Sequence, residues 1–144
     1  MLGLRDFIST IARKMSPLAS AKGLQIQFSE SSDINVHTDA DKLELIVQNI
    51  LSNAIKNTRQ GSISIDCGAE GDMFFVRVKD TGAGIEGDKL DLIFSRFYHG
   101  AESIGLGLGL AIVKELLEVM GGHIDVESIP GQGTAFTIWL PKND

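Results

Sequence analysis

Apolar residues recur at helical spacing in separate stretches of this 144-residue chain. Between these stretches, apolar and polar residues alternate, as in strands, so the chain must combine helices with a sheet. The first long stretch predicts a helix that begins at Thr38 or Asp39 and ends near Asn57. Its apolar stripe consists of Leu43, Ile46, Val47, Ile50, Leu51 and Ala54. A second long helix is expected from Leu108 to Met120, closed by Gly121 and Gly122.

Another helical stretch begins the chain and is expected to stop at Pro17, with Gly23 beyond it. Its apolar members are Leu4, Phe7, Ile8, Ile11, Ala12 and Met15. Two interpretations stay open: a helix packed on its own domain, or the tail of a longer helix from a neighbouring domain. On the second interpretation, residues 1–22 are a linker and residues 23–144 form the domain itself.

Alternating apolar and polar residues predict the strands of the sheet. They run through Leu24 to Phe28, Ser62 to Asp66, Met73 to Asp80, His123 to Ser128 and Thr134 to Leu140. Turns are expected at Gly68 to Asp72 and at Pro130 to Gly133, and a short helical piece near Leu90 to Phe97. Together the elements indicate an α+β sandwich, with a mixed, mostly antiparallel sheet packed on helices.

Length and composition exclude several classes of protein. A chain of this length with 43% apolar residues suits one globular core. The net charge of −6 argues against a nucleic-acid surface. The chain contains no stretch of roughly 18 apolar residues, the length that spans a bilayer, and shows no secretory leader. We therefore expect a cytoplasmic domain without membrane contact of its own, even if its parent protein is membrane-anchored, with Cys67 as a small buried residue.

One polar face of the helix that follows Asp39 suits a polyphosphate with its cation. Asn49, Asn53 and Lys56 stand at positions i, i+4 and i+7, so they share a face away from the apolar stripe. An amide oxygen can ligate Mg²⁺, and the Lys56 ammonium can neutralise phosphate charge. Taken alone, the pattern is weak, and polar residues on a solvated helix face are the default interpretation.

Asp80 ends a predicted strand directly before two closely spaced glycines, Gly82 and Gly84. Asp80 lies at an even number of positions from the apolar residues of that strand, so its side chain points to the same face. Its carboxylate is therefore expected on the buried side, where an unpaired charge is costly. The exocyclic amine of adenine would supply a hydrogen-bond donor, and the glycines would let backbone approach the base. A β-turn cap by Asp80 is the alternative.

A glycine-rich run opens the second long helix, at the end where backbone N–H groups can face phosphate. It consists of Gly105, Leu106, Gly107, Leu108 and Gly109. The run lacks the lysine of a P-loop, and it does not follow a strand inside a βαβ unit. A dinucleotide-binding Rossmann site is therefore not supported.

In their order, these motifs resemble the N, G1, F, G2 and G3 boxes of histidine kinase catalytic domains. The segments are Asn49 to Lys56, Asp80 to Ile85, Ile93 to Tyr98, Gly105 to Ile112 and Gly131 to Thr134. The resemblance covers about Leu24 to Pro141. It implies the Bergerat ATP-binding fold, shared with gyrase, MutL and heat-shock chaperone ATPases, and it implies ATP and Mg²⁺ as cofactors.

The resemblance also implies a role for each site residue. Asn53 would ligate Mg²⁺, Asn49 and Lys56 would contact the phosphates, and Asp80 would read adenine. Further nucleotide contacts would come from Asn57, Gly82, Gly84, Ile85, Phe97, Tyr98, Gly105, Leu106, Gly107, Leu108, Gly109 and Thr134. The segment from Tyr98 to Gly105 would be the ATP lid.

Residue types at three positions qualify the implied chemistry. ATPases of the superfamily carry a glutamate base where this chain has Asn49, and an amide cannot take a proton from water, so phosphoryl transfer to another protein is favoured over hydrolysis. Asn57 replaces an aromatic residue that often packs on adenine. His99 replaces a frequent arginine at the γ-phosphate, and we assign it a catalytic role beside Asn49 and Lys56.

None of the histidines, His37, His99 and His123, stands in the His-Glu context followed by a proline that marks the family's phosphoacceptor helix. The resemblance therefore implies that the acceptor is a histidine-bearing dimerisation domain of the same parent protein, with a response regulator downstream. Two alternatives stay open: a degenerate nucleotide-binding or interaction module, and an anti-sigma-factor type serine kinase of the same fold.

Overall fold

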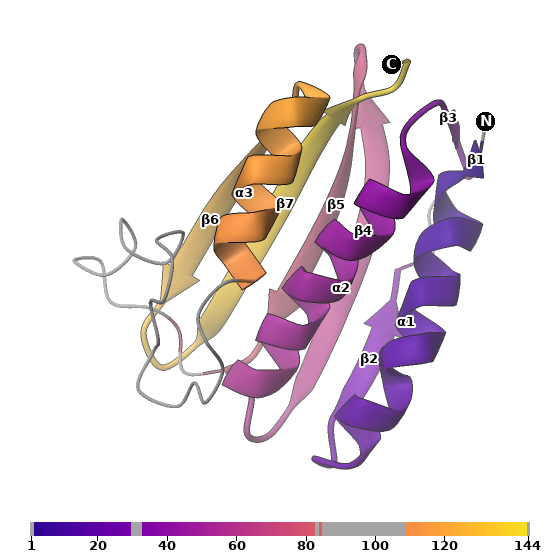
Figure 1. Cartoon of the computed structure of the whole chain (residues 1–144). Helices are drawn as coiled ribbons and strands as arrows, with labels where there is room; N and C mark the ends of the chain where they lie inside the picture. The colour runs from indigo at the N-terminus through magenta and orange to yellow at the C-terminus, as the bar shows by residue number, and fades with distance from the viewer. Residues whose placement is uncertain (1, 30–32, 83, 85–108, 144) are drawn as a thin grey trace.

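The computed structural model describes residues 2–29, 33–82, 84 and 109–143, and within these ranges helices cover one face of a five-stranded sheet (Figure 1). The elements are β1 (Leu2–Gly3), α1 (Leu4–Ser20), β2 (Gln25–Phe28), β3 (Asn35–Val36), α2 (Ala40–Asn57), β4 (Ser62–Glu70), β5 (Met73–Asp80), α3 (Gly109–Met120), β6 (His123–Ile129) and β7 (Gly133–Pro141). The predicted α+β sandwich is confirmed. None of the helices in these ranges combines the length and apolar character needed to cross a membrane.

The strand order of the main sheet is β2-β4-β5-β7-β6. β2 runs parallel to β4, and the other neighbours are antiparallel, which confirms a mixed, mostly antiparallel sheet. A small antiparallel pair, β1 and β3, lies where the chain enters α1. β5 lies between β4 and β7 and is the central strand of the sheet. Its last residue, Asp80, therefore lies where the central strand ends.

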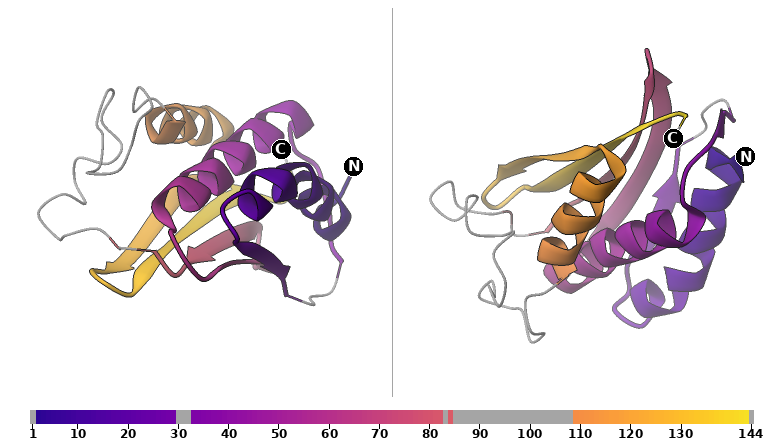
Figure 2. Two further views of the ribbon diagram at one scale, coloured as in Figure 1. Left: turned by 90° about the horizontal axis from the view of Figure 1, so that it is seen from below. Right: turned by 45° about the horizontal axis from the view of Figure 1, so that its top comes forward.

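Figure 2 shows the helices on one face of the sheet, and buried apolar side chains of both layers form one core cluster. The predicted stripe of α2 is buried in full, from Leu43 to Ala54. The sheet contributes buried side chains from alternate positions, among them Phe74 and Phe136. Each such side chain contributes about 1.5–3 kcal/mol through burial. The same alternation brings Asp80 to the helix side.

The first helix is longer than its proline suggested. α1 continues through Pro17 to Ser20, so the predicted stop at Pro17 is wrong. The buried Ala19 extends the apolar face beyond the proline, and Gly23, with φ of 73°, supplies the left-handed turn that ends the helix. Leu24 N–H then donates to the carbonyl of Ala19 at 2.9 Å. The apolar face of α1 belongs to the same core as α2.

The hairpin turn between β4 and β5 is shorter than predicted. β4 continues to Glu70, so the predicted turn at Gly68 to Asp72 narrows to Gly71 and Asp72, with φ of 58° at Gly71. Gly68 is part of the strand instead, paired with Phe75, and a Cβ there would lie 3.0 Å from the Phe75 ring. The β6–β7 turn likewise narrows to residues 130–132.

α3 ends as the sequence predicted. Gly121 has φ of 79°, and Gly122 N–H donates to the Leu117 carbonyl at 2.8 Å. The expected helical piece from Leu90 to Phe97, and the expected helix start at Leu108, lie outside the described residues. At the other long helix, the cap is Asp39 rather than Thr38, because Lys42 N–H donates to Asp39 Oδ1 at 3.1 Å.

Candidate active site

The carboxylate of Asp80 is buried at the end of β5, with 2% of the residue exposed. Its Oδ1 accepts the backbone N–H of Gly82 at 2.9 Å and that of Thr134 at 3.3 Å. Burial raises the pKa of Asp80 above its usual 3.8, and the two N–H donors oppose that rise. The bond to Gly82 is the turn cap considered as an alternative, so Asp80 is both a turn cap and a buried carboxylate.

Gly82 packs directly on the end of α2. A Cβ at this position would clash with the carbonyl oxygen of Asn57 and would lie 3.0 Å from Asp80 Oδ1. A residue with a side chain would therefore separate the loop from the helix. The loop after β5 and the last residue of α2 meet here, as the sequence assignment of Asn57, Asp80 and Gly82 to one site required.

The turn between β6 and β7 closes the site from the other side. A Cβ at Gly133 would clash with the backbone carbonyl of Asp80, and one at Gly84, where φ is 76°, would clash with the Ile129 carbonyl. Thr134 is buried, and its hydroxyl is 2.9 Å from Ser128 Oγ. The Gly131 to Thr134 motif therefore lies against the loop that follows Asp80.

Thr81 is a structural residue of the site to which the sequence assigned no role. Its hydroxyl accepts Ser62 N–H at 3.2 Å and donates to the Gln60 carbonyl at 3.3 Å. A Cβ at Gly61, where φ is 115°, would clash with that hydroxyl. These contacts join the loop after Asp80 to the α2–β4 connection. The signal that could have identified it is a hydroxyl residue directly after the strand-ending aspartate.

The predicted polar face of α2 is present, but its residues differ in exposure. Asn49 and Asn53 are half-buried, and Lys56 is exposed. Asn49 Nδ2 donates to the Leu45 carbonyl at 2.7 Å, while its Oδ1 would lie 3.0 Å from a Cβ on Gly109. The start of α3 therefore lies beside Asn49, which brings the first described residue of the glycine-rich run to the polar face of α2.

The side-chain amide of Asn53 is the unusual polar group of this face. Its Nδ2 is buried, and no hydrogen-bond partner reaches it within the described ranges. A buried amide left without a partner costs about 1–3 kcal/mol. Rotation of the amide exchanges its nitrogen and oxygen, so the same place can present either a donor or an acceptor.

The remaining predicted site residues lie outside the described residues: Ile85, Phe97, Tyr98, His99, Gly105, Leu106, Gly107 and Leu108. The described ranges contain no group of three or more His, Cys, Asp or Glu side chains that could hold a metal ion. A Mg²⁺ ion at Asn53 would accordingly take most of its oxygen ligands from phosphate and water.

Comparisons with known proteins agree with this geometry. The family model described as "Histidine kinase-, DNA gyrase B-, and HSP90-like ATPase" matches residues 38–144. Sensor histidine kinase ZraS of Salmonella typhimurium is 36% identical over 143 residues, which cover 97% of this chain and 30% of ZraS. Sensor histidine kinase RcsC of Escherichia coli is 35% identical over 144 residues, which cover 95% of this chain and 15% of RcsC. The chain thus spans less than a third of either relative.

Solved structures give the same answer for the fold. Full-length ShkA in complex with AMPPNP superposes with a TM-score of 0.90 at 34% identity, over 97% of this chain and 30% of ShkA. The nucleotide-free catalytic domain of the histidine kinase ThkA superposes with a TM-score of 0.87 at 26% identity, over 99% of this chain and 94% of that domain.

Proposed function

This chain belongs to the histidine kinase-, DNA gyrase B- and HSP90-like ATPase family, and from that premise we propose that it transfers the γ-phosphoryl group of ATP to a histidine on a separate dimerisation domain. It is an ATP-binding catalytic domain of the sensor histidine kinase type. The observation that carries the proposal is the buried carboxylate of Asp80, held at the meeting point of the motif segments.

Adenine recognition is assigned to Asp80. Both described hydrogen bonds to its carboxylate fall on Oδ1, and within the described ranges no donor reaches Oδ2. The exocyclic amine of adenine is a donor that suits this oxygen, and its hydrogen bond would favour the ionised carboxylate that burial disfavours. Gly82, Gly84 and Gly133 let the backbone segments around Asp80 pack closely, since a Cβ at any of them would clash with a backbone carbonyl group.

Phosphate and metal binding are assigned to the polar face of α2. Asn53 is assigned to Mg²⁺ through its amide oxygen, which rotation of the amide would bring to the place of the unpartnered Nδ2, and Asn49 and Lys56 share its helix face. Bound Mg²⁺ supplies charge neutralisation on the phosphates. The exposed Lys56 ammonium adds a second positive charge beside the phosphates. The start of α3 lies beside Asn49, and backbone N–H groups at a helix N-terminus suit phosphate.

Transfer to a protein, rather than to water, is favoured by the residue at position 49. Asn49 holds its Nδ2 on the Leu45 carbonyl, and an amide has no basic site that could take a proton from water at neutral pH. A nucleophile must therefore arrive with its own reactivity, as a histidine imidazole does. The chain's part is to hold the nucleotide and orient its γ-phosphate.

The acceptor is assigned to another domain because the described histidines lie far from Asp80. His123 stands in register with Trp139, whereas Asp80 stands in register with Thr134 at the other end of β7. His37 bridges to Asn143, beyond the same far end. Residues 1–22 would lead from the acceptor domain into residues 23–144, in the cytoplasm, with a response regulator downstream.

Transfer can be tested with γ-labelled ATP and Mg²⁺. The chain alone should form no acid-labile phosphohistidine, and adding the histidine-bearing dimerisation domain of the parent protein should give label on that domain only. The rate should be low, because the tether that raises the effective concentration is absent. Acid-labile label on His37, His99 or His123 of this chain would contradict the proposal. Measured ATP binding without any transfer would favour the degenerate-module alternative.

A further inference from the structure

The C-terminal end of α2 is closed differently from the ends of α1 and α3. Those two helices end in a left-handed glycine, Gly23 and Gly121, whereas α2 ends at Thr58 with φ of −108° and ψ of 119°. Without a glycine turn, the last carbonyl groups of α2 need donors from elsewhere. Thr58 Oγ1 supplies one donor, to the Ala54 carbonyl at 2.7 Å.

Lys22 supplies the donors for the next two carbonyl groups. Its Nζ donates to the Ile55 carbonyl at 2.6 Å and to the Lys56 carbonyl at 3.3 Å, from 33 and 34 residues away in the sequence. An ammonium at a helix C-terminus also interacts favourably with the helix dipole. Charge-assisted hydrogen bonds of this kind are about twice as strong as neutral ones.

The turn that Lys22 holds belongs to the nucleotide site. Lys56 is the assigned phosphate ligand, and the next residue, Asn57, presents its carbonyl to Gly82. Gly82 in turn donates its N–H to Asp80 at 2.9 Å. A continuous set of contacts therefore leads from Lys22, through the last turn of α2, to the carboxylate assigned to adenine.

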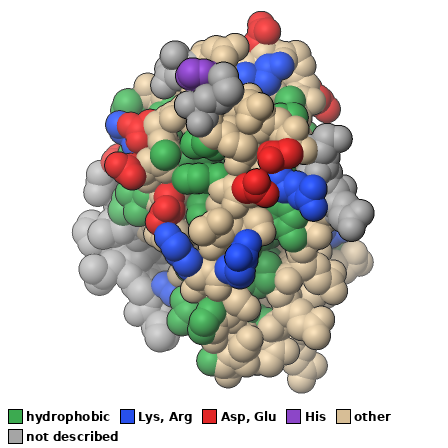
Figure 3. Space-filling view, turned by 90° about the vertical axis from the view of Figure 1, so that its right-hand side faces the viewer, with side chains coloured by type: hydrophobic (Ala, Val, Ile, Leu, Met, Phe, Trp, Pro, Cys, Tyr) green, Lys and Arg blue, Asp and Glu red, His purple; other side chains and the backbone are tan. Residues whose placement is uncertain are grey.

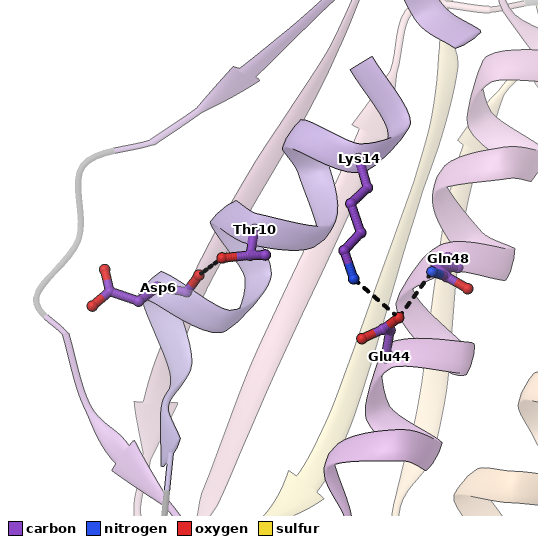
Figure 4. Close-up of polar contacts among 5 residues, drawn as sticks. All are labelled: Asp6, Thr10, Lys14, Glu44 and Gln48. Atoms are coloured by element: carbon purple, nitrogen blue, oxygen red, sulfur yellow. Dashed lines mark hydrogen bonds and ion pairs between the residues drawn. The ribbon is translucent and has the colours of Figure 1, made fainter. Parts of the chain in front are cut away.

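Lys14, a lysine within α1, also reaches α2 but contacts it away from this turn. Lys14 Nζ lies 3.6 Å from Glu44 Oε2, which also accepts a hydrogen bond from Gln48, as Figure 4 shows. Both side chains of this ion pair are partly exposed. Acidic and basic side chains intermingle on the α1 side of the molecule in Figure 3, so each lysine there acts through its local contacts rather than through a single-sign surface.

We propose that Lys22 is a positioning residue for the nucleotide site: it fixes the last turn of α2, so that Lys56 and the Asn57–Gly82 contact keep the geometry that the nucleotide needs. The inference rests on the proposed nucleotide site. It also makes the end of α1 part of that site's support, since Lys22 follows Ser20, the last residue of α1, by two positions.

The test compares Lys22→Met, Lys22→Arg and Lys14→Met in the full chain, well below the unfolding temperature of each variant. Calorimetry with Mg-AMPPNP and nuclear magnetic resonance titration with adenosine give the two affinities. Lys22→Met should weaken both by about three- to tenfold, Lys22→Arg should restore most of the loss, and Lys14→Met should bind as the parent does. The Gly82 amide resonance should shift in Lys22→Met and not in Lys14→Met.

Each other outcome has a defined meaning. Loss of Mg-AMPPNP affinity without loss of adenosine affinity, with the Lys56 and Gly82 amide resonances unshifted, would show a long-range charge effect, and it would overturn the positioning role. Parent-like binding of Lys22→Met would overturn it as well, while leaving the proposed function intact. Failure of the parent chain to bind Mg-AMPPNP would instead overturn the proposed function.

Discussion

The backbone N–H of Thr134 donates to Oδ1 of Asp80 at 3.3 Å, although the two residues are 54 positions apart in the sequence. The contact exists because β5 and β7 are neighbours in the sheet and Asp80 stands in register with Thr134. It joins the motif that ends β5 to the motif that begins β7. The carboxylate is therefore held by the sheet as well as by its own turn.

Asp80→Asn should weaken Mg-ATP binding by about 100-fold or more, because the amide presents donors where the adenine amine needs an acceptor. The fold should persist, since the amide oxygen can accept the Gly82 and Thr134 N–H groups in place of Oδ1. Calorimetry measures the affinity. Asp72→Asn, at the exposed turn before β5, is the matched control and should bind as the parent does. An Asp80→Asn affinity within a few-fold of the parent would remove Asp80 from the adenine site.

The same substitution should change how stability depends on pH. Because burial raises the pKa of Asp80 in the folded chain, the folded state binds this proton more tightly than the unfolded state. The stabilisation from protonation is complete below the ordinary value of 3.8 and is lost as pH rises through the raised pKa. At neutral pH the nucleotide-free Asp80→Asn chain should therefore be more stable than the parent.

Urea unfolding of both chains at neutral pH and at pH values approaching 3.8 measures that difference. The advantage of Asp80→Asn should shrink as the pH falls toward 3.8, since other carboxyl groups titrate equally in the two chains. A difference that grows on acidification would mean that the folded-state pKa of Asp80 is lowered instead.

The Asn53→Ala substitution distinguishes a role of Asn53 in metal binding from a role in nucleotide binding. The substitution should weaken Mg-AMPPNP by about tenfold or more and metal-free AMPPNP by less than about twofold, because the lost group is assigned to the cation. The nucleotide-free chain should be at least as stable as the parent, since a buried amide without a partner is removed. Gln48→Ala, which removes an amide bonded to Glu44 on the same helix, is the control. Equal losses with and without Mg²⁺ would exclude Asn53 as a metal ligand.

Gly82→Ala tests the contact between the loop and α2. The new Cβ would clash with the Asn57 carbonyl, so we expect a loss of about 2 kcal/mol in unfolding free energy, together with weaker nucleotide binding. Gly71→Ala, in the β4–β5 turn, places a methyl group where no atom lies within 4 Å, and its cost comes only from φ of 58°. It should leave nucleotide affinity unchanged. Equal affinities for the two variants would show that the Gly82 contact does not shape the site.

Several features of the site could be predicted from sequence because they depend on spacing along one element. The parity of β5 placed Asp80 on the buried side, and the helical spacing of Asn49, Asn53 and Lys56 placed them on one face. The predicted end of α1 at Pro17 was wrong. A proline in the last turn removes one hydrogen bond, but burial of Ala19 still stabilises the helix beyond it. The local sequence does not show which of the two effects, the lost hydrogen bond or the burial of Ala19, is larger.

The local sequence was enough to predict the classes of the elements and the buried stripe of α2, since each follows from residue types at short, regular separations. Three features became visible only in the folded chain. Thr134 N–H donates to Asp80, Lys22 donates to carbonyl groups at the end of α2, and the Asn53 amide nitrogen has no partner in the described part of the chain. Those contacts depend on which strands and helices become neighbours. Neighbours are selected by burial of the whole core, which no single segment encodes.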